Sequence, residues 1–103
     1  MTASNTTNHQ ISDNVIIVLV EKVVRESPCL SLSKKKKPVR IYAVEDSRKL
    51  DVSVEVEYGC DIPAAVKAFQ RRVKFALEKV TGIEIKEVNV TVDGLNLESI
   101  IEQ

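Results

Sequence analysis

The sequence of 103 residues contains few of the side chains on which small scaffolds and active sites often depend. It has no Trp, two Phe, two Tyr, two Cys and one His. Two cysteines are too few for a disulfide-rich secreted scaffold, and they lack the CxxC spacing of a zinc site or a redox pair. We therefore expect Cys29 and Cys60 to be reduced thiols.

Motifs that carry chemistry are also missing. The chain lacks a GxxxxGK[ST] phosphate loop, a GxGxxG turn and a GxSxG elbow. Its one histidine, His9, lies within residues 1–10, which we interpret as a flexible tail where no side chain is held in the geometry of general-base catalysis. The sequence thus predicts a non-enzymatic protein with no catalytic residue, no cofactor and no metal site.

Long hydrophobic runs are absent as well. The longest, residues 15–20, is far shorter than the roughly 20 residues that cross a bilayer. The first ten residues are polar and lack the basic and apolar regions of a signal peptide. We expect a cytoplasmic protein without a membrane span.

The sequence also lacks an excess of charge of one sign. Fifteen basic residues balance fifteen acidic ones, which argues against a protein that coats nucleic acid by bulk electrostatics. The charges are nevertheless segregated, because residues 34–80 carry a net +5 and residues 81–103 a net −4. This pattern favours a sided surface or self-association.

Sixteen Val and nine Ile make up about a quarter of the chain, and their spacing predicts the elements. Apolar residues at helical spacing predict a helix over residues 11–26, although its β-branched run is also compatible with a strand. A hairpin is predicted from a strand over 39–45, a turn over 46–49 and a strand over 50–58, where apolar and polar residues alternate.

The second half of the chain predicts a helix and one more strand. The helix begins after Asp61 as N-cap and ends at Gly82. The last strand, over 83–93, changes the parity of its apolar positions, so we expect a bulge at Lys86–Glu87, and then a turn at Asp93–Gly94.

The resulting order, α-β-β-α-β, predicts an α+β two-layer sandwich. Its three-stranded mixed sheet includes a right-handed parallel crossover, and two helices cover one face. We assign residues 1–10 to the tail, 11–95 to a single domain and 96–103 to a C-terminal tail.

Two surfaces are candidates for binding. The first helix is apolar on nearly all sides, so a second subunit is expected to cover part of it. This candidate oligomer surface consists of Val15, Ile16, Ile17, Val18, Leu19 and Val20. Basic residues in a loop and on the second helix form a candidate anion-binding set: Lys34, Lys35, Lys36, Lys37, Arg71 and Lys74.

One group of residues carries a family resemblance. A Tyr-Gly-x-x-Ile-Pro junction and a Val-Asn-Val strand flank a helix of fitting length, and the matching positions are Tyr58, Gly59, Ile62, Pro63, Gln70, Gly82, Val88, Asn89 and Val90. In these residues the chain resembles the alkaline shock protein family, the envelope stress response proteins of Gram-positive bacteria. It departs from the family at residues 27–30, where relatives close the first helix with a Gly-Val step.

The resemblance implies a small, non-enzymatic cytoplasmic protein that forms homo-oligomers. Some relatives gather beneath the membrane through a membrane-anchored protein partner and serve envelope homeostasis or stress. Our first hypothesis is therefore an interaction or scaffold protein linked to envelope stress. The alternative is a KH-like nucleic-acid-binding module that uses the Lys34–Lys37 loop, although a GxxG loop and stacking aromatics are missing.

Overall fold

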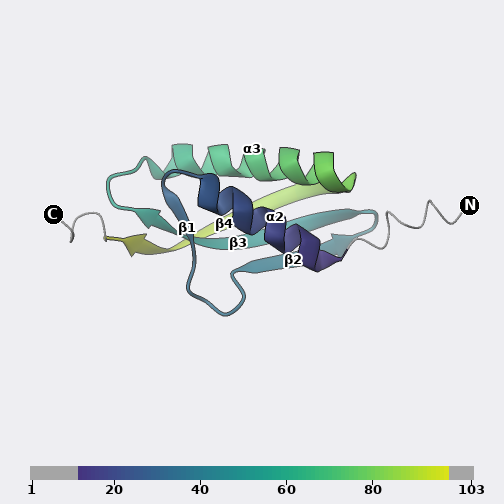
Figure 1. The fold of residues 1–103 in the computed structure, drawn as a ribbon, viewed down its shortest axis with the longest axis horizontal. Coiled ribbons are helices and arrows are strands. Elements are labelled where there is room, and N and C mark those ends of the chain that lie inside the picture. The colour runs from purple at the N-terminus through teal and green to yellow at the C-terminus, as the bar shows by residue number, and fades with distance from the viewer. Residues whose placement is uncertain (1–11, 98–103) are drawn as a thin grey trace, which may run out of the picture.

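A computed structural model describes residues 12–97 of the chain (Figure 1). The elements follow in the order α2 (Asp13–Glu26), β1 (Leu30–Leu32), β2 (Val39–Val44), β3 (Ser47–Glu57), α3 (Ile62–Thr81) and β4 (Glu84–Asn96). The tail predicted over residues 1–10 and most of the one predicted over 96–103 lie outside the described residues.

Strand β3 is the centre of a four-stranded sheet. Along one edge it pairs antiparallel with β1, opposite Val54–Val56, and with β2, opposite Ser47–Val52. Along the other edge it pairs in parallel with β4, as expected for a crossover through α3. The prediction of three strands is wrong, because residues 30–32 form an additional short strand, β1. Three residues are too few to show the alternation that reveals a strand.

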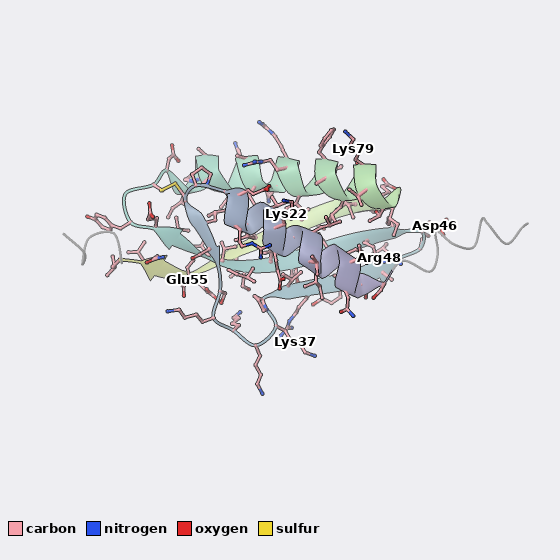
Figure 2. All side chains as sticks on the ribbon, in the orientation of Figure 1. Lys22, Lys37, Asp46, Arg48, Glu55 and Lys79 are labelled. Atoms are coloured by element: carbon pink, nitrogen blue, oxygen red, sulfur yellow. A yellow bond between two sulfur atoms is a disulfide. The ribbon has the colours of Figure 1, made fainter. Side chains whose placement is uncertain are left out.

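The two strands on the same edge belong to one interrupted line of pairing. The Ser33 amide donates to the carbonyl of Ser53 (3.0 Å), and the Ser53 amide donates to the carbonyl of Pro38 (2.8 Å). A single residue of β3 thus joins the end of β1 to the start of β2. The intervening residues, Lys34–Lys37, are excluded from the sheet and form a loop that projects from its edge (Figures 1 and 2).

The core lies between the sheet and both helices. Alternate residues of β3 point into it and are fully buried: Leu50, Val52, Val54 and Val56. Helix α2 adds Ile16, Val20, Val23 and Val24 to the same cluster, and helix α3 adds Phe69, Val73 and Leu77. Because all these side chains form one cluster, the two helices cover one face of the sheet. The α+β two-layer class is thereby confirmed.

Strand β4 contains the predicted bulge. Ile85 lies opposite Arg48 and Glu87 opposite Lys49, so Lys86 is the extra residue. The bulge lets Ile85 and Val88 both be buried despite their opposite parity.

The turn predicted at Asp93–Gly94 is wrong, because β4 continues to Asn96. A second register shift leaves Asp93 without an opposite residue on β3 and places Gly94 opposite Glu55. A Cβ on Gly94 would lie 2.9 Å from the Glu55 Cγ, so glycine is needed here for close approach and not for reversal of the chain. The hairpin turn is also shorter than predicted. It consists of Glu45, with φ 55°, and Asp46, and β3 begins at Ser47.

Cys29 and Cys60 form a disulfide, with 6.2 Å between their Cα atoms, which corrects the prediction of reduced thiols. The bond ties the connection between α2 and β1 to the junction between β3 and α3 (Figure 2). Pairing of β1 with the end of β3 brings these segments together, since the Glu57 amide donates to the Cys29 carbonyl (2.9 Å). Sequence spacing alone does not show this proximity, because it depends on the unpredicted strand β1.

Two phenylalanines of α3 give a matched test of the core. Phe69 is 1 % exposed and Phe75 is 67 % exposed. We expect Phe69→Ala to lower the free energy of unfolding by about 3–5 kcal/mol through the cavity it leaves. Phe75→Ala should change it by less than about 0.5 kcal/mol. Urea unfolding followed by circular dichroism measures both, and equal effects would contradict the orientation of α3.

The disulfide closes a loop of 31 residues in sequence separation. By the chain-entropy relation, its reduction should lower the free energy of unfolding by about 3–4 kcal/mol. Urea unfolding with and without a phosphine reductant measures the difference, with the Cys29→Ser/Cys60→Ser double variant as a control that should not respond. Two titratable thiols in protein that is denatured without reductant would show that the bond is not formed.

Candidate interaction surfaces

Most of the apolar run in α2 serves the protein's own core. The helix begins at Ser12, whose hydroxyl oxygen accepts a hydrogen bond from the Asn14 amide (3.0 Å). Ile16 and Val20 are buried, and Ile17 and Leu19 pack partly against the core. Val15 and Val18 remain 44 % and 57 % exposed. The candidate oligomer surface is therefore narrowed to these two valines, which lie three residues apart and hence on the same side of the helix.

The lysine loop is anchored at its base and exposed at its tip. The Ser33 hydroxyl donates to the Asp93 carboxylate (2.8 Å), and the Lys35 ammonium lies 3.8 Å from the same carboxylate. All four lysines are exposed. In residues 12–97, Lys35 is the one lysine of the four that forms an ion pair.

The candidate anion-binding set does not form one patch. Arg71 and Lys74 are exposed on α3, which packs over β4, whereas the lysine loop leaves the opposite edge of the sheet. Figure 1 shows α3 along one side of the molecule and the loop between β1 and β2 on the other side. A single extended anion therefore cannot bridge both groups across one flat surface.

The residues that carry the family resemblance hold the β3–α3–β4 unit together. Gly59 has φ 91° at the junction before α3, and Gly82 has φ 74° at its C-cap. The Gln70 side-chain amide donates to the Val88 carbonyl (2.8 Å), which links α3 to β4. The Asn89 side chain donates to the Asp51 carboxylate (3.2 Å) on the uncovered face of the sheet.

The remaining motif residues fit the same interpretation. Ile62 and Pro63 begin α3, where the Asp61 carboxylate accepts from the Ala64 amide (3.2 Å). Val88 is buried and Val90 packs partly against the core. Tyr58 is the exception, because its side chain is 58 % exposed. The motif residues therefore determine the geometry of the strand–helix–strand unit more than they mark a binding site.

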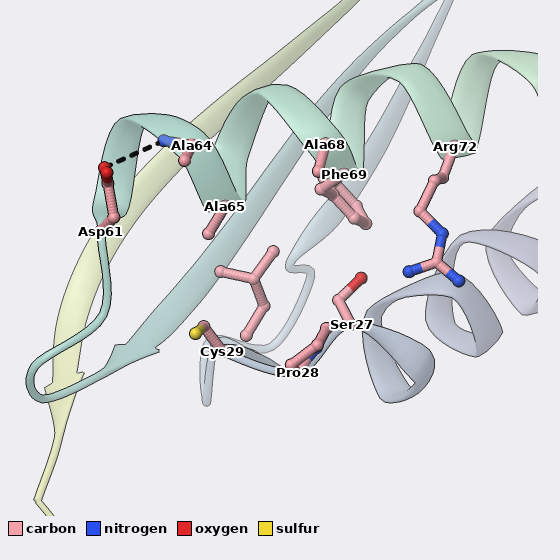
Figure 3. Close-up of a pocket in the computed structure, with 10 residues that line it drawn as sticks. Ser27, Pro28, Cys29, Asp61, Ala64, Ala65, Ala68, Phe69 and Arg72 are labelled. Atoms are coloured by element: carbon pink, nitrogen blue, oxygen red, sulfur yellow. Dashed lines mark hydrogen bonds between the residues drawn. The ribbon is translucent and has the colours of Figure 1, made fainter.

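An apolar hollow beside the disulfide was not predicted from the sequence. Its volume is about 290 Å³, and it lies between the first half of α3 and the connection from α2 to β1 (Figure 3). Ala64, Ala65, Ala68 and Phe69 form one wall, and the Arg72 side chain extends across one end toward Ser27. The hollow offers apolar contacts, the guanidinium of Arg72 and the carboxylate of Asp61, and its lining residues include no nucleophile paired with a base.

One ion pair lies on the exposed surface of α2. The Lys22 ammonium donates to the Glu26 carboxylate (2.9 Å), and this hydrogen bond lowers the pKa of Glu26. Both side chains are at least half exposed, so the pair contributes little to stability. Within the described part of the chain, no group of three or more His, Cys, Asp or Glu side chains is placed to hold a metal ion.

Comparison with known proteins identifies one match. Residues 25–97 match the sequence profile of the alkaline shock protein family, which is described by a cell envelope-related function. No curated protein and no solved structure matches the chain. None of the helices over residues 12–97 is both long and apolar enough to cross a membrane.

The motif glycine at the end of α3 can be tested directly. Gly82 adopts a left-handed conformation, and nothing lies within 4 Å of the position of an added Cβ. Gly82→Ala should therefore lower the free energy of unfolding by about 1–2 kcal/mol through backbone strain alone. Gly82→Asn is the matched control and should cost less, because Asn tolerates this conformation. Chemical denaturation measures both, and equal costs would refute the conformational explanation.

Proposed function

Because the chain belongs to the alkaline shock protein family, whose function is related to the cell envelope, we propose that it is a non-enzymatic interaction protein of that system. It acts by self-association and by binding a membrane-anchored protein partner. The family match covers most of the domain, from the end of α2 through β4. Family membership supports the link to the envelope, and the exposed surface of α2 supports association.

The observation that carries self-association is the exposure of Val15 and Val18. Both side chains lie on the side of α2 that faces away from the sheet, whereas Ile16 and Val20 of the same helix are buried in the core. A second copy that covered this side would bury both valines and gain hydrophobic free energy without any change in the fold.

The proposed location is the cytoplasmic side of the envelope. The disulfide is the observation that weighs against a reducing compartment, since such bonds are rare in the cytosol. Rapid alkylation of thiols in intact cells, followed by non-reducing electrophoresis, decides the point. Free Cys29 and Cys60 in living cells support the cytoplasmic location, and an oxidised pair overturns it.

The nucleic-acid alternative gains no comparable support. Its basic residues lie on opposite sides of the molecule, and the uncovered sheet face carries acidic side chains such as Asp51 and Glu55. Bases would meet like charge there in place of stacking aromatics. We therefore do not propose nucleic-acid binding.

Self-association can be tested with one substitution and a matched control. Sedimentation velocity across micromolar concentrations should show wild-type protein whose sedimentation coefficient rises with concentration. Val18→Asp places a charge in the association surface and should weaken association by about tenfold or more. Val80→Asp, at a valine that is 61 % exposed on α3, is the control and should behave like wild type. A strictly monomeric wild type, or equal effects of both variants, would contradict the proposal.

A further inference from the structure

The outward side of α3 is a cationic face with an aromatic residue at its centre. At about 100° per residue, Phe75 lies opposite the buried line of Phe69, Val73 and Leu77. Phe75 is 67 % exposed, whereas the other phenylalanine of the chain, Phe69, is 1 % exposed. We define the α3 outer face as Lys67, Arg71, Lys74, Phe75 and Lys79, all of which are exposed.

No free acidic side chain opposes this face along the helix. The single acidic residue of α3, Glu78, is half-buried, and its carboxylate accepts a hydrogen bond from the Ile85 amide of β4 (2.9 Å). The Lys79 ammonium lies 5.5 Å from the centre of the Phe75 ring, so a cation and an aromatic face are presented together. The outer face therefore combines the apolar area of Phe75 with four basic side chains, and the one carboxylate of the helix is hydrogen-bonded to β4.

The bulge in β4 extends the positive charge beyond the helix. Lys86, the extra residue of the bulge, lines a shallow hollow of about 300 Å³ together with Arg71 and Lys74. Glu87, the acidic residue of this hollow, is paired with Lys49 (3.3 Å) on the neighbouring strand. Three cations from two elements thus surround a hollow in which the one carboxylate is already neutralised.

The shape of this surface distinguishes between anionic partners. Helix α3 runs along one side of the molecule, and Figure 2 shows its side chains, Lys79 among them, projecting away from the body. Apart from the shallow hollow beside Lys86, the surface is the outer side of one straight helix, so it suits a flat partner better than a peptide helix, which needs a long concave site. Basic side chains near an anionic bilayer are attracted to its surface, and an exposed aromatic side chain can add apolar contact at the boundary between headgroups and acyl chains.

We propose that the α3 outer face and Lys86 bind the surface of an anionic phospholipid bilayer. Phe75 enters the boundary between headgroups and acyl chains, while Arg71, Lys74 and Lys86 contact lipid phosphates. The surface shares no residue with Val15 and Val18 of α2. If bilayer binding fails its test, the proposed self-association therefore still stands. If self-association fails its test, the proposed bilayer binding is unaffected.

Vesicle co-sedimentation at low ionic strength tests the proposal with matched variants. Wild-type protein should bind vesicles that contain phosphatidylglycerol and should not bind pure phosphatidylcholine. Each basic residue removed from the interface should weaken binding about fivefold, so Arg71→Gln/Lys74→Gln/Lys86→Gln should weaken it about a hundredfold. Lys34→Gln/Lys36→Gln/Lys37→Gln removes the same charge from the opposite side of the molecule and should leave binding within about twofold of wild type.

A fluorescent probe reports which side chain enters the bilayer. Because the chain has no Trp, Phe75→Trp introduces a single reporter, and Tyr42→Trp places one at an exposed position of β2 as a control. Anionic vesicles should shift the emission of the first variant to shorter wavelengths and leave that of the second unchanged. Phe75→Ala, which leaves the core intact, should weaken vesicle binding several-fold.

Three outcomes would overturn the proposal. The first is wild-type protein that does not bind anionic vesicles at low salt. The second is an equal loss of binding in the two triple variants, which would indicate net charge and not a defined face. The third is binding of polyglutamate or single-stranded RNA through Arg71, Lys74 and Lys86 without binding of vesicles, which would assign the face to another class of partner.

Discussion

The hydrogen bonding of β3 on both edges is the constraint from which the rest of the structure follows. Among the described strands, β3 is the one that pairs with all the others, and its inward side chains are fully buried from Leu50 to Val56. A slip of one residue would turn these side chains to solvent, so one register is strongly favoured. With β3 fixed, β1 and β2 share one edge, and the four lysines between them are excluded from the sheet.

Where a local pattern coincides with a tertiary requirement, the sequence predicted the structure well. The alternation in β3, the caps of α3 at Asp61 and Gly82 and the bulge near Lys86 are examples. Prediction failed where a feature depends on a partner distant in sequence. Strand β1 is too short to show a period, and Gly94 follows Asp93 as in a turn although Glu55 is what requires it. The disulfide was missed because it depends on β1.

The candidate surfaces were predictable only in part, for a related reason. Exposure of the Lys34–Lys37 loop follows from its composition, and it was found. A helix that is apolar on nearly all sides does not reveal which residues its own sheet will bury, so four residues of the α2 run were assigned to an interface although they contact the core. No prediction was made for Phe75 from the sequence, although the helical spacing of Phe69, Val73 and Leu77 places it on the outward side of α3.

The balanced net charge hides two cationic regions that are held in different ways. The lysine loop is a projecting segment anchored by Ser33 and Asp93, whereas the α3 outer face is oriented by the core residues on the reverse side of the same helix. Because the core fixes which side of α3 faces outward, Phe75 and its neighbouring cations are presented together without a rearrangement of the backbone, which limits the entropy lost on binding. The α3 outer face shares no residue with Val15 and Val18 of α2. If both proposed contacts form at the same time, self-association would add the weak bilayer contacts of single chains into a stronger attachment.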